Sequence, residues 1–264
     1  LMKKFLVIGN PIEHSLSPII HNYWIKSNGI NAIYEKRKLD EVELDQLILQ
    51  IKKKKIDGVN VTVPFKKTII PLLDELSIEA DNTQSVNTLY LKDNKVIGHN
   101  TDIFGFEKSI KKSEHDVLNK EVFILGAGGV VPSIIFALNK MKAAKIKISN
   151  RTKEKAENLK KLFKNIELIE WGEVPNFDII INATSIGLKK EDYISLDFSS
   201  TSRNSLFYDV IYNPRETNFL KTGKKLGNKT INGKLMFIYQ ALSAFDIWHG
   251  IKPNVNKNVI KLLD

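Results

Sequence analysis

A chain of 264 residues, 42% of them hydrophobic, is long enough to bury a sizeable core and to form two modest domains. It contains no cysteine, which excludes disulfides and thiolate metal sites, and its five histidines show no metal-binding spacing, so we expect no metal. The first apolar run, Phe5 to Ile8, is too short for a signal peptide or a membrane span, and no later run is better suited. We therefore expect a cytoplasmic protein without a membrane partner.

Forty Lys and Arg residues against thirty Asp and Glu residues give a net charge of +10, which raises the hypothesis of nucleic-acid binding. The lysines are scattered, however, in runs such as IKKKKI at residues 51–56, and no aromatic residues alternate with them as a base-stacking surface requires. We expect no nucleic-acid partner, whereas an anionic small ligand is compatible with this charge.

Strand-like and helix-like segments alternate through the first hundred residues. Apolar runs predict strands, and apolar residues at helical spacing predict helices. The predicted strands are Phe5 to Ile8, Ile33 to Glu35 and Val59 to Val63, and the predicted helices are Ile19 to Ser27 and Glu41 to Lys54. Short strand candidates and turn residues fill Thr83 to Gly98. This alternation is typical of an α/β sheet with parallel pairing.

The segment HSLSPIIHNYW, residues 14–24, follows the first predicted strand. Ser17 is a good helix N-cap and Pro18 a good first helical residue. A helix N-terminus flanked by the hydroxyls of Ser15 and Ser17 can hold a carboxylate without an arginine. Helix capping explains Ser17 equally well, but it does not explain Ser15.

The segment GVNVTVPFKK, residues 58–67, predicts a strand with unequal faces. Alternation places Val59, Val61 and Val63 on one face, and Asn60 and Thr62 on the other. A helix-covered parallel sheet is normally apolar on both faces, so the two polar side chains need partners, and a polar ligand is a natural one. Pro64 ends the strand and leaves Lys66 at the edge where open α/β sheets bind ligands, although a solvated lysine like Lys67 is the alternative.

A second alternating series begins at Glu121. The string EVFILGAGG predicts a buried strand that ends in glycines, VVPSIIFALNKM a helix, and AKIKISN a second strand, so residues 121–150 form a βαβ unit. Gly126 permits a tight turn, and Gly128 lets backbone N–H groups approach a pyrophosphate at the helix N-terminus. Val131 stands where this motif usually has Gly or Ala, and a glycine turn without a ligand is the alternative.

The end of the second strand of this unit reads SNRTKEK, residues 149–155, without the Asp or Glu by which NAD-binding proteins hold the ribose. Arg151 can form a bidentate contact with a 2′-phosphate, Asn150 and Thr152 can add hydrogen bonds, and Lys155 adds charge. We therefore predict that the cofactor is NADP rather than NAD. The alternatives are that Thr152 caps the next helix and that Lys155 is solvated.

The remaining segments continue the α/β pattern. Further strands are predicted at Glu167 to Glu170, Asp178 to Asn182 and Ser205 to Val210, with a helix in Lys153 to Lys164 and a last long helix from Lys234 to His249. The last helix has an apolar stripe that faces a core. Gln240 interrupts this stripe and needs a partner. The predicted domain junction is the polar string GHNTDIFG, residues 98–105.

Taken together, several strings resemble the shikimate dehydrogenase family over nearly the whole chain. They are SLSPIIHN from residue 15, GVNVTVPFK from 58, SVNTL from 85, GHNTDIFG from 98, GAGG from 126, SNRT from 149, NATSIG from 182, YDVIYNP from 208 and NGKLMFIYQALSAFDIW from 232. Each is modest evidence alone, but their order and spacing together are highly specific. Val130 and Val131 depart from the small residues that are common after GAGG, and Val210 stands where some relatives have Met.

The resemblance implies reversible NADPH-dependent reduction of 3-dehydroshikimate to shikimate, in the biosynthesis of chorismate and aromatic amino acids. It also implies two α/β domains with a cleft between them. Residues 1–103 with 235–264 would form a substrate domain with a mostly parallel sheet, and residues 104–234 a Rossmann-like NADP-binding domain. The chain would be a monomer or a homodimer. A relative that uses quinate or NAD as well, and a non-catalytic ligand-binding relative, are the alternatives.

The resemblance also implies roles for individual residues. Lys66 matches the catalytic lysine, and Asp102 would orient it and bind the neighbouring substrate hydroxyl; the alternative for Asp102 is an acid in the first turn of a helix. The implied substrate-binding residues are Ser15, Ser17, Asn60, Thr62, Asn87, Asp102, Tyr212 and Gln240. The implied cofactor-binding residues are Gly126, Ala127, Gly128, Gly129, Val130, Asn150, Arg151, Thr152, Lys155, Thr184, Ser185, Val210 and Gly233. Hydride transfer to a ketone needs a proton or a fixed cation at the oxygen, and a lysine ammonium supplies both.

Overall fold

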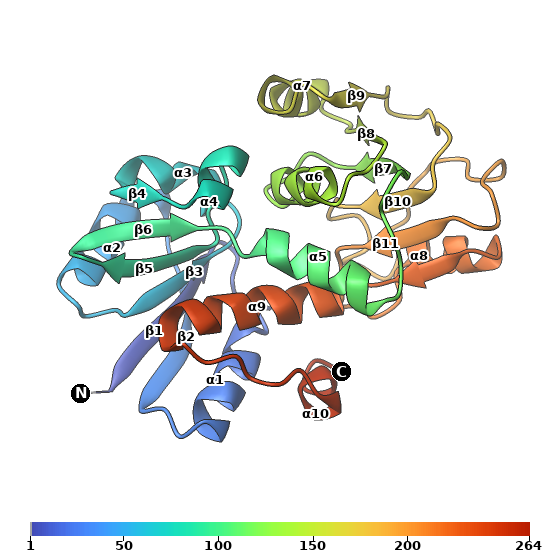
Figure 1. Ribbon diagram of the computed structural model, residues 1–264. Helices are drawn as coiled ribbons and strands as arrows, with labels where there is room; N and C mark the ends of the chain where they lie inside the picture. The colour runs from blue at the N-terminus through green and yellow to red at the C-terminus, as the bar shows by residue number, and fades with distance from the viewer. Residues whose placement is uncertain (1) are drawn as a thin grey trace. The chain divides into compact units, whose positions relative to one another are not determined.

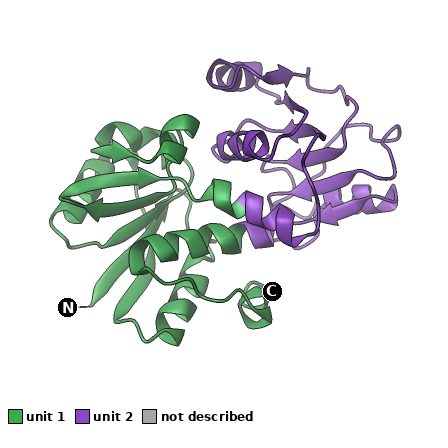
Figure 2. Cartoon of the chain, in the orientation of Figure 1, with its two compact units in different colours: residues 1–105, 237–264 green, residues 106–236 purple. Residues whose placement is uncertain are grey.

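A computed structural model describes residues 2–264, which form two compact units (Figure 2). Unit 1 comprises the described residues up to Gly105 together with Phe237–Asp264, and unit 2 comprises Phe106–Met236. Both changes of unit fall inside helices, namely α5 (Asp102–Lys112) and α9 (Lys234–His249). Each unit has its own sheet and its own core, which confirms the predicted two-domain α/β fold.

Unit 1 is built on a six-stranded sheet in the order β2-β1-β3-β5-β6-β4 (Figure 1). Its strands are β1 (Lys3–Gly9), β2 (Ala32–Lys38), β3 (Gly58–Val61), β4 (Glu75–Leu76), β5 (Thr88–Lys92) and β6 (Lys95–His99). Its other helical elements are α1 (Ser17–Ser27), η1 (Glu41–Glu43), α2 (Leu44–Lys52), α3 (Phe65–Thr68), η2 (Ile70–Leu72), α4 (Ile78–Thr83) and α10 (Lys257–Lys261). Only β5 runs against its neighbours, so the sheet is mostly parallel, as predicted.

The antiparallel course of β5 decides which loops of unit 1 meet. In the register of the sheet, Val7 lies beside Asn60, and Asn60 lies beside Thr88. Thr88 in turn lies beside His99. The carboxyl ends of β1, β3 and β6 therefore reach the same edge of the sheet as the amino end of β5.

The predicted strand Val59 to Val63 is too long, because β3 ends at Val61. The N–H of Phe65 donates to the carbonyl oxygen of Thr62 at 2.9 Å, so the chain turns there into α3. Val63 is consequently 57% exposed, whereas Val59 and Val61 are buried. The prediction that Val63 shares their buried face is wrong.

The predicted N-cap of α1 is also displaced. Leu16 occupies the N-cap position, and its carbonyl oxygen accepts the N–H of Ile19 at 3.1 Å. Ser17 is the first helical residue, and its own N–H donates to the side-chain oxygen of Ser15 at 3.3 Å. The hydroxyl of Ser15 thus satisfies a free N–H group at the start of the helix, a role that was expected of Ser17.

Unit 2 has a six-stranded, wholly parallel sheet in the order β12-β11-β10-β7-β8-β9. Its strands are β7 (Glu121–Leu125), β8 (Lys145–Ser149), β9 (Ile166–Leu168), β10 (Ile179–Asn182), β11 (Leu206–Asp209) and β12 (Lys229–Ile231). Its own helices are α6 (Val131–Lys140), α7 (Lys153–Leu162) and α8 (Asn218–Lys225). The strand order reverses between β7 and β10, which is where doubly wound sheets bind nucleotides at their carboxyl ends.

The last long helix, α9, packs its C-terminal half on the sheet of unit 1. The Trp248 indole N–H donates to the carbonyl oxygen of Leu89 at 3.0 Å, and its ring centre lies 5.0 Å from that of Phe5. Phe245 is fully buried. Across residues 2–264, no helix combines the length and the apolarity needed to cross a membrane.

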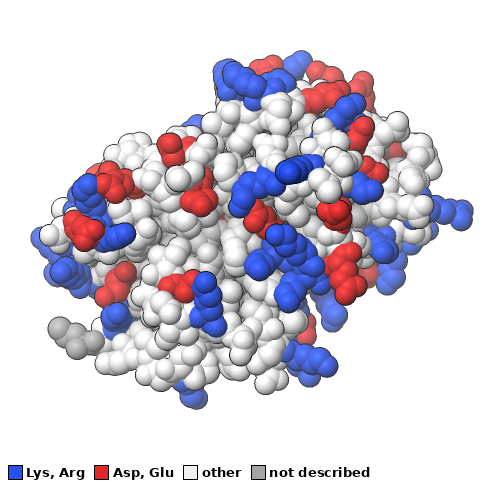
Figure 3. All heavy atoms as spheres, in the orientation of Figure 1, with Lys and Arg blue, Asp and Glu red and all other residues white. Residues whose placement is uncertain are grey.

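Basic and acidic side chains occur near one another on the surface. Figure 3 shows basic and acidic atoms interspersed on the face in view. Several pairs make ion contacts within one unit, such as Lys4 with Glu35 at 2.7 Å and Lys52 with Asp74 at 2.8 Å. Some of the lysines are therefore paired with a nearby carboxylate.

An aromatic cluster joins α1, β2 and α9 in unit 1, and His21 lies at its centre. The imidazole stacks on Tyr34, with ring centres 4.2 Å apart and planes 2° from parallel. It also contacts the rings of Trp24, Phe245 and Trp248. Among the described residues, neither ring nitrogen of His21 has a hydrogen-bond partner. Burial, with a smaller effect of nearby His249, lowers the pKa of His21 to about 3.

His21 should therefore make folding sensitive to acid. Because the pKa of His21 is lower in the folded state, its contribution to stability is complete above pH 6.5 and is lost as the pH falls toward about 3. Replacing it in His21→Phe, or in the smaller His21→Leu, should reduce the pH dependence of the unfolding free energy below pH 6.5 by about 1.4 kcal/mol per pH unit. Denaturant titrations between pH 4 and 7 measure this slope. His14→Gln, at an exposed histidine, is the control, and an unchanged slope in both His21 variants would contradict the assignment.

Candidate functional site

Polar side chains gather at the edge of unit 1 where β1, β3 and β6 end and β5 begins. Ser15 and Ser17 follow β1, Thr62 and Lys66 follow β3, and Asp102 follows β6. Asn87 directly precedes β5. Because β5 runs antiparallel, its first residues lie at the same edge as the ends of the other strands. Residues far apart in the sequence are therefore brought to one place.

Lys66 and Asp102 form an ion pair at this edge. The Nζ atom of Lys66 lies 2.5 Å from Oδ2 of Asp102, and the two side chains are 13% and 9% exposed. Lys67, the next residue of α3, is exposed. Sequence reasoning left open which of the two lysines is solvated, and the structure answers that it is Lys67. A nearly buried cation with one carboxylate partner can stabilise negative charge or transfer a proton.

Asn87 holds Asp102 in place. Its amide nitrogen donates to Oδ1 of Asp102 at 3.1 Å and to the hydroxyl of Thr101 at 2.8 Å. Its side-chain oxygen accepts the backbone N–H of Thr101 at 2.8 Å. The N–H of Asp102 donates to the side chain of Asn100 at 3.0 Å. Asp102 is the first residue of α5, as the helix-start alternative expects, and the same carboxylate is the partner of Lys66.

Asn60 finds its partners within the protein. Its amide nitrogen donates to the carbonyl oxygen of Asn87 and to the hydroxyl of Thr88, both at 3.1 Å. Its oxygen accepts the hydroxyl of Tyr34 at 2.7 Å. The prediction that Asn60 needs partners is confirmed, and protein groups before and on β5 and on β2 supply them.

The remaining predicted substrate residues have different surroundings. Ser17 is buried at the start of α1. Thr62 is partly buried in the loop after β3. The amide nitrogen of Gln240 donates to the carbonyl oxygen of Phe237 at 2.9 Å, within its own helix. The partner that Gln240 needs is thus local.

Tyr212 belongs to unit 2, in the loop after β11, and is partly buried. Burial raises the pKa of Tyr212 to about 12. Its hydroxyl therefore stays protonated over the working range of pH and can donate a hydrogen bond.

The glycine turn of unit 2 has the shape that phosphate binding requires. Gly126 follows β7 with a φ of +110°, and a Cβ atom there would lie 2.8 Å from the carbonyl oxygen of Ala183. Gly128 is exposed, and a Cβ atom there would meet only that same oxygen, at 3.9 Å. Ala127 and Val130 are partly buried, whereas Gly129 is exposed.

The helix after this turn starts at Val131, which is fully buried. The valine that stands where the glycine motif usually has Gly or Ala is therefore accommodated in the core of unit 2. Within the described residues, no side chain caps the start of α6, where Pro132 carries no N–H and the N–H of Val131 donates to the carbonyl oxygen of Gly128 at 3.0 Å. The turn leaves open space beside Gly128, as the close approach of a ligand would require.

The loop after β8 carries the predicted determinants of cofactor choice. Arg151, Thr152 and Lys155 are exposed, and the side chain of Arg151 makes no hydrogen bond or ion pair within residues 2–264. The amide of Asn150 donates to the carbonyl oxygen of Thr152 at 2.8 Å. Thr152 occupies the N-cap position of α7 without a side-chain cap. The guanidinium is therefore available to an incoming phosphate.

The other predicted cofactor residues follow β10, β11 and β12, at the same carboxyl edge of the sheet. Thr184 and Val210 are partly buried, and Ser185 is exposed. Gly233 lies so close to Val210 that a Cβ atom on it would be 2.0 Å from the Val210 carbonyl oxygen.

Asp209 organises these loops and was missed by sequence reasoning. Its carboxylate accepts Thr217 Oγ1 at 2.6 Å, the Ile211 N–H at 3.0 Å and the Asn182 amide at 3.1 Å. Asn182 in turn accepts the N–H of Thr184 at 3.1 Å. Burial, opposed by these hydrogen bonds, raises the pKa of Asp209 to about 6. The string YDV, with an acid at the end of a buried strand, was the available signal.

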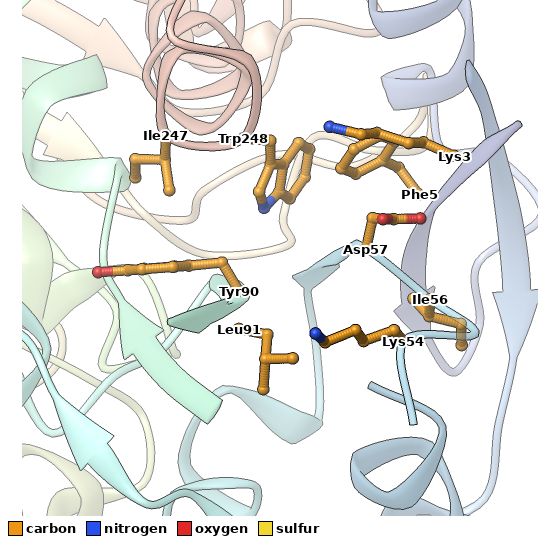
Figure 4. Close-up of a pocket in the computed structure, with 9 residues that line it drawn as sticks. All are labelled: Lys3, Phe5, Lys54, Ile56, Asp57, Tyr90, Leu91, Ile247 and Trp248. Atoms are coloured by element: carbon orange, nitrogen blue, oxygen red, sulfur yellow. The ribbon is translucent and has the colours of Figure 1, made fainter. Parts of the chain in front are cut away.

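A cavity of about 270 Å³ lies at the opposite edge of the unit 1 sheet (Figure 4). It is lined by Lys3, Phe5, Lys54, Ile56, Asp57, Tyr90, Leu91, Ile247 and Trp248. Lys3 begins β1 and Asp57 precedes β3, so the cavity is at the amino ends of these strands, whereas Lys66 follows the carboxyl end of β3. It contains none of the predicted site residues. Within residues 2–264, no group of three or more His, Asp or Glu side chains is arranged to hold a metal ion.

Comparison with known proteins gives a consistent result over the whole chain. Residues 7–89 match the family described as shikimate dehydrogenase substrate binding domain, and residues 108–220 match the family described as shikimate / quinate 5-dehydrogenase. The chain is 62% identical to the shikimate dehydrogenase (NADP(+)) of Pelagibacter ubique, over 100% of both chains.

Solved structures agree with these matches. A shikimate dehydrogenase crystallised in complex with NADP+ superposes with a TM-score of 0.92 at 37% identity, covering 99% of this chain and 94% of that one. The shikimate 5-dehydrogenase of Thermus thermophilus, in complex with NADP(H) and shikimate, superposes with a TM-score of 0.91 at 28% identity, covering 99% and 98%.

The two glycines of the turn after β7 should respond differently to an added methyl group. Gly126→Ala should destabilise the protein by roughly 2–3 kcal/mol, because it places a side chain at positive φ against a backbone oxygen. Gly128→Ala should change stability by less than about 1 kcal/mol, since space is open there. Thermal unfolding of both variants measures the difference. Equal Tm values for the two variants would show that the turn is not built as described.

Proposed function

The chain belongs to the shikimate dehydrogenase family, and from this premise we propose how its residues bind the substrate and carry out the reaction. Its activity is the reversible NADP-dependent reduction of 3-dehydroshikimate to shikimate, a step in the biosynthesis of aromatic amino acids. It is therefore an oxidoreductase that acts on a CH–OH group.

Lys66 is the proposed acid and base of the reaction. As the carbonyl carbon is reduced, negative charge develops on the oxygen, and the Lys66 ammonium stabilises this charge and delivers the proton. In the oxidation of shikimate, the neutral amine takes the hydroxyl proton back. Asp102, 2.5 Å from Lys66, keeps the amine in place and accepts a hydrogen bond from the adjacent substrate hydroxyl. This nearly buried pair is the single observation that carries the proposal.

The substrate carboxylate is proposed to bind at the other end of the polar edge. The hydroxyls of Ser15 and Ser17 lie at the start of α1, whose first N–H groups carry partial positive charge. Thr62, Asn60, Asn87, Gln240 and Tyr212 complete the proposed substrate pocket. Because Asn60 and Asn87 already use both of their amide hydrogens, we assign them to shaping the pocket through Asp102 and the neighbouring strands.

NADP is the cofactor, and when bound as NADPH it supplies the hydride. We propose that its pyrophosphate lies on the turn from Gly126 to Val130 and that its 2′-phosphate is held by Asn150, Arg151, Thr152 and Lys155. Thr184, Ser185, Val210 and Gly233 would lie near the nicotinamide.

The domain assignment follows from these roles. We assign substrate binding to residues 1–103 with 235–264, and NADP binding to residues 104–234. The match of residues 7–89 to a substrate binding domain supports this assignment. The cytoplasmic location and the oligomeric state, monomer or homodimer, stay predictions.

Removing the Lys66 amine should abolish most of the turnover. In Lys66→Met, kcat should fall by about 10²–10⁴-fold, because no group replaces the acid and the cation. Shikimate-induced thermal stabilisation shows whether the variant still binds its substrate. Lys67→Met is the matched control, since its side chain is exposed, and it should retain the kcat of the wild-type protein. A Lys66→Met protein that folds, binds shikimate and turns over normally would remove Lys66 from the mechanism.

Arg151 should determine the preference for NADP. In Arg151→Ala, kcat/KM with NADP should fall by about 10–100-fold while kcat/KM with NAD stays the same, because only the 2′-phosphate loses its partner. Steady-state rates with shikimate and with quinate, each against both cofactors, measure this and identify the preferred substrate. Lys161→Ala, an exposed lysine farther along α7, is the control. A wild-type protein with equal kcat/KM for NAD and NADP would contradict the role of Arg151. Comparable rates with quinate and shikimate would favour the alternative of a relative that uses quinate as well.

A further inference from the structure

The cavity at the amino ends of β1 and β3 takes no part in the proposed reaction. It has a volume of about 270 Å³, and all the residues that line it belong to unit 1. None of them is assigned to the substrate or to NADP. A space of this size is close to the lower limit of the pockets in which proteins bind small molecules. The cavity is therefore a second place in unit 1 where a small ligand fits.

One wall of the cavity is apolar and firmly held. The indole of Trp248 lies over Gly58, where a Cβ atom would be 2.4 Å from the indole nitrogen. This nitrogen donates to the carbonyl oxygen of Leu89 at 3.0 Å, and Phe5 packs beside the ring with centres 5.0 Å apart. Trp248 and Leu91 are nevertheless only partly buried. A fixed aromatic surface that is partly open can receive an apolar group without rearrangement.

Charged groups of both signs line the same cavity. Lys3 and Lys54 contribute ammonium groups, and Asp57 contributes a carboxylate. Within residues 2–264, the side chains of Lys3 and Lys54 form no ion pair and no hydrogen bond. Asp57 accepts the backbone N–H of Lys4 with Oδ2 at 2.8 Å, while its Oδ1 has no hydrogen-bond partner among these residues. Two cations and one carboxylate oxygen thus remain available to a ligand.

The backbone at Lys54 has an unusual conformation. Its φ of +56° lies in the left-handed region, which residues other than glycine seldom adopt. Its N–H donates to the carbonyl oxygen of Ile51 at 2.9 Å and closes the turn after α2. In the view of Figure 4, the Lys54 side chain extends below the Asp57 carboxylate and the Trp248 ring, toward Leu91. The ammonium group, the carboxylate and the indole therefore line one space.

These groups together favour one class of ligand. The lysines attract a carboxylate, Asp57 attracts an ammonium group, and the indole of Trp248 packs well against an aromatic ring. A simple anion would be repelled by Asp57, and a simple amine would be repelled by the lysines. An α-amino acid carries its carboxylate and its ammonium group on one carbon atom, with the side chain beside them, so it satisfies all three.

We propose that this cavity binds a free α-amino acid with an aromatic side chain: its carboxylate pairs with Lys54 and Lys3, its ammonium group pairs with Asp57, and its ring packs on Trp248. The site is separate from the proposed substrate pocket, because the cavity is at the amino end of β3 and Lys66 follows the carboxyl end. Binding there requires neither shikimate nor NADP.

Isothermal titration calorimetry with L-phenylalanine, L-tyrosine and L-tryptophan tests the proposal. At least one of them should bind the wild-type protein with a Kd at or below about 1 mM. The analogues of the tightest binder that lack the ammonium group or the carboxylate should bind at least about tenfold more weakly. For L-phenylalanine these are 3-phenylpropionate and phenethylamine. If none of the three amino acids binds, or if either analogue binds as tightly as its amino acid, the proposal is wrong.

Three variants locate the bound amino acid. Lys54→Met and Asp57→Asn each remove one charge, and the asparagine keeps an oxygen that can accept the N–H of Lys4. Each should weaken binding by about tenfold or more. Lys53→Met is the matched control, because Lys53 is exposed and does not line the cavity, and it should bind the amino acid like the wild-type protein. All three should keep the wild-type kcat with shikimate. Wild-type affinity in both Lys54→Met and Asp57→Asn would overturn the proposal.

Competition with shikimate distinguishes this cavity from the proposed substrate pocket. The Kd of the amino acid should change by less than about fivefold when shikimate is present in excess. Loss of binding under these conditions would place the amino acid at Ser15 and Ser17 and overturn the proposal. The test does not depend on turnover. A protein that binds the amino acid in this cavity but does not convert shikimate would refute the proposed function and still support this inference.

Discussion

The antiparallel course of β5 within an otherwise parallel sheet is the constraint on which the candidate site of unit 1 depends. In a wholly parallel sheet, the residue before a strand lies at the opposite edge from the residues that follow its neighbours. Because β5 is reversed, Asn87 at its start reaches Asp102 after β6, and both lie beside the loop that carries Lys66. The hydrogen bond from Asn87 to Asp102, which holds the carboxylate of the ion pair, is a consequence of this one reversal.

The two units present polar groups in different ways. Unit 1 uses buried side chains, each with several protein partners, which suits the recognition of a compact acid with several hydroxyls. Unit 2 offers an open glycine turn before α6 and exposed cations after β8, which suits phosphate groups. The order of its strands places these groups beside the point where the sheet reverses direction.

Much of the fold followed from the sequence, because apolar runs and helical spacing report burial directly. The βαβ unit at residues 121–150 is the clearest case, and the choice of NADP agrees with the relatives. Predictions failed where tertiary contacts decide which side chains are buried and which partners they have. Sequence cannot distinguish Lys66 from Lys67, since contact with the first turn of α5 buries one and not the other. Nor can it show that Tyr34 is the partner of Asn60, because that requires the register of neighbouring strands. The three-residue β12 is too short to show any periodicity.

The buried carboxylate of Asp209 lowers the stability of unit 2 at neutral pH while it holds the loops after β10 and β11 by hydrogen bonds. A carboxyl whose pKa rises from 3.8 to about 6 on folding binds its proton more tightly in the native state. Its favourable contribution is complete below pH 3.8 and is lost as the pH rises through 6, so at neutral pH the buried charge costs on the order of 3 kcal/mol. The three groups that donate to this anion are neutral, and a cation there would relieve the penalty. Removing the carboxylate would not simply recover this free energy, because Thr217, Asn182 and the Ile211 N–H would each lose a buried acceptor.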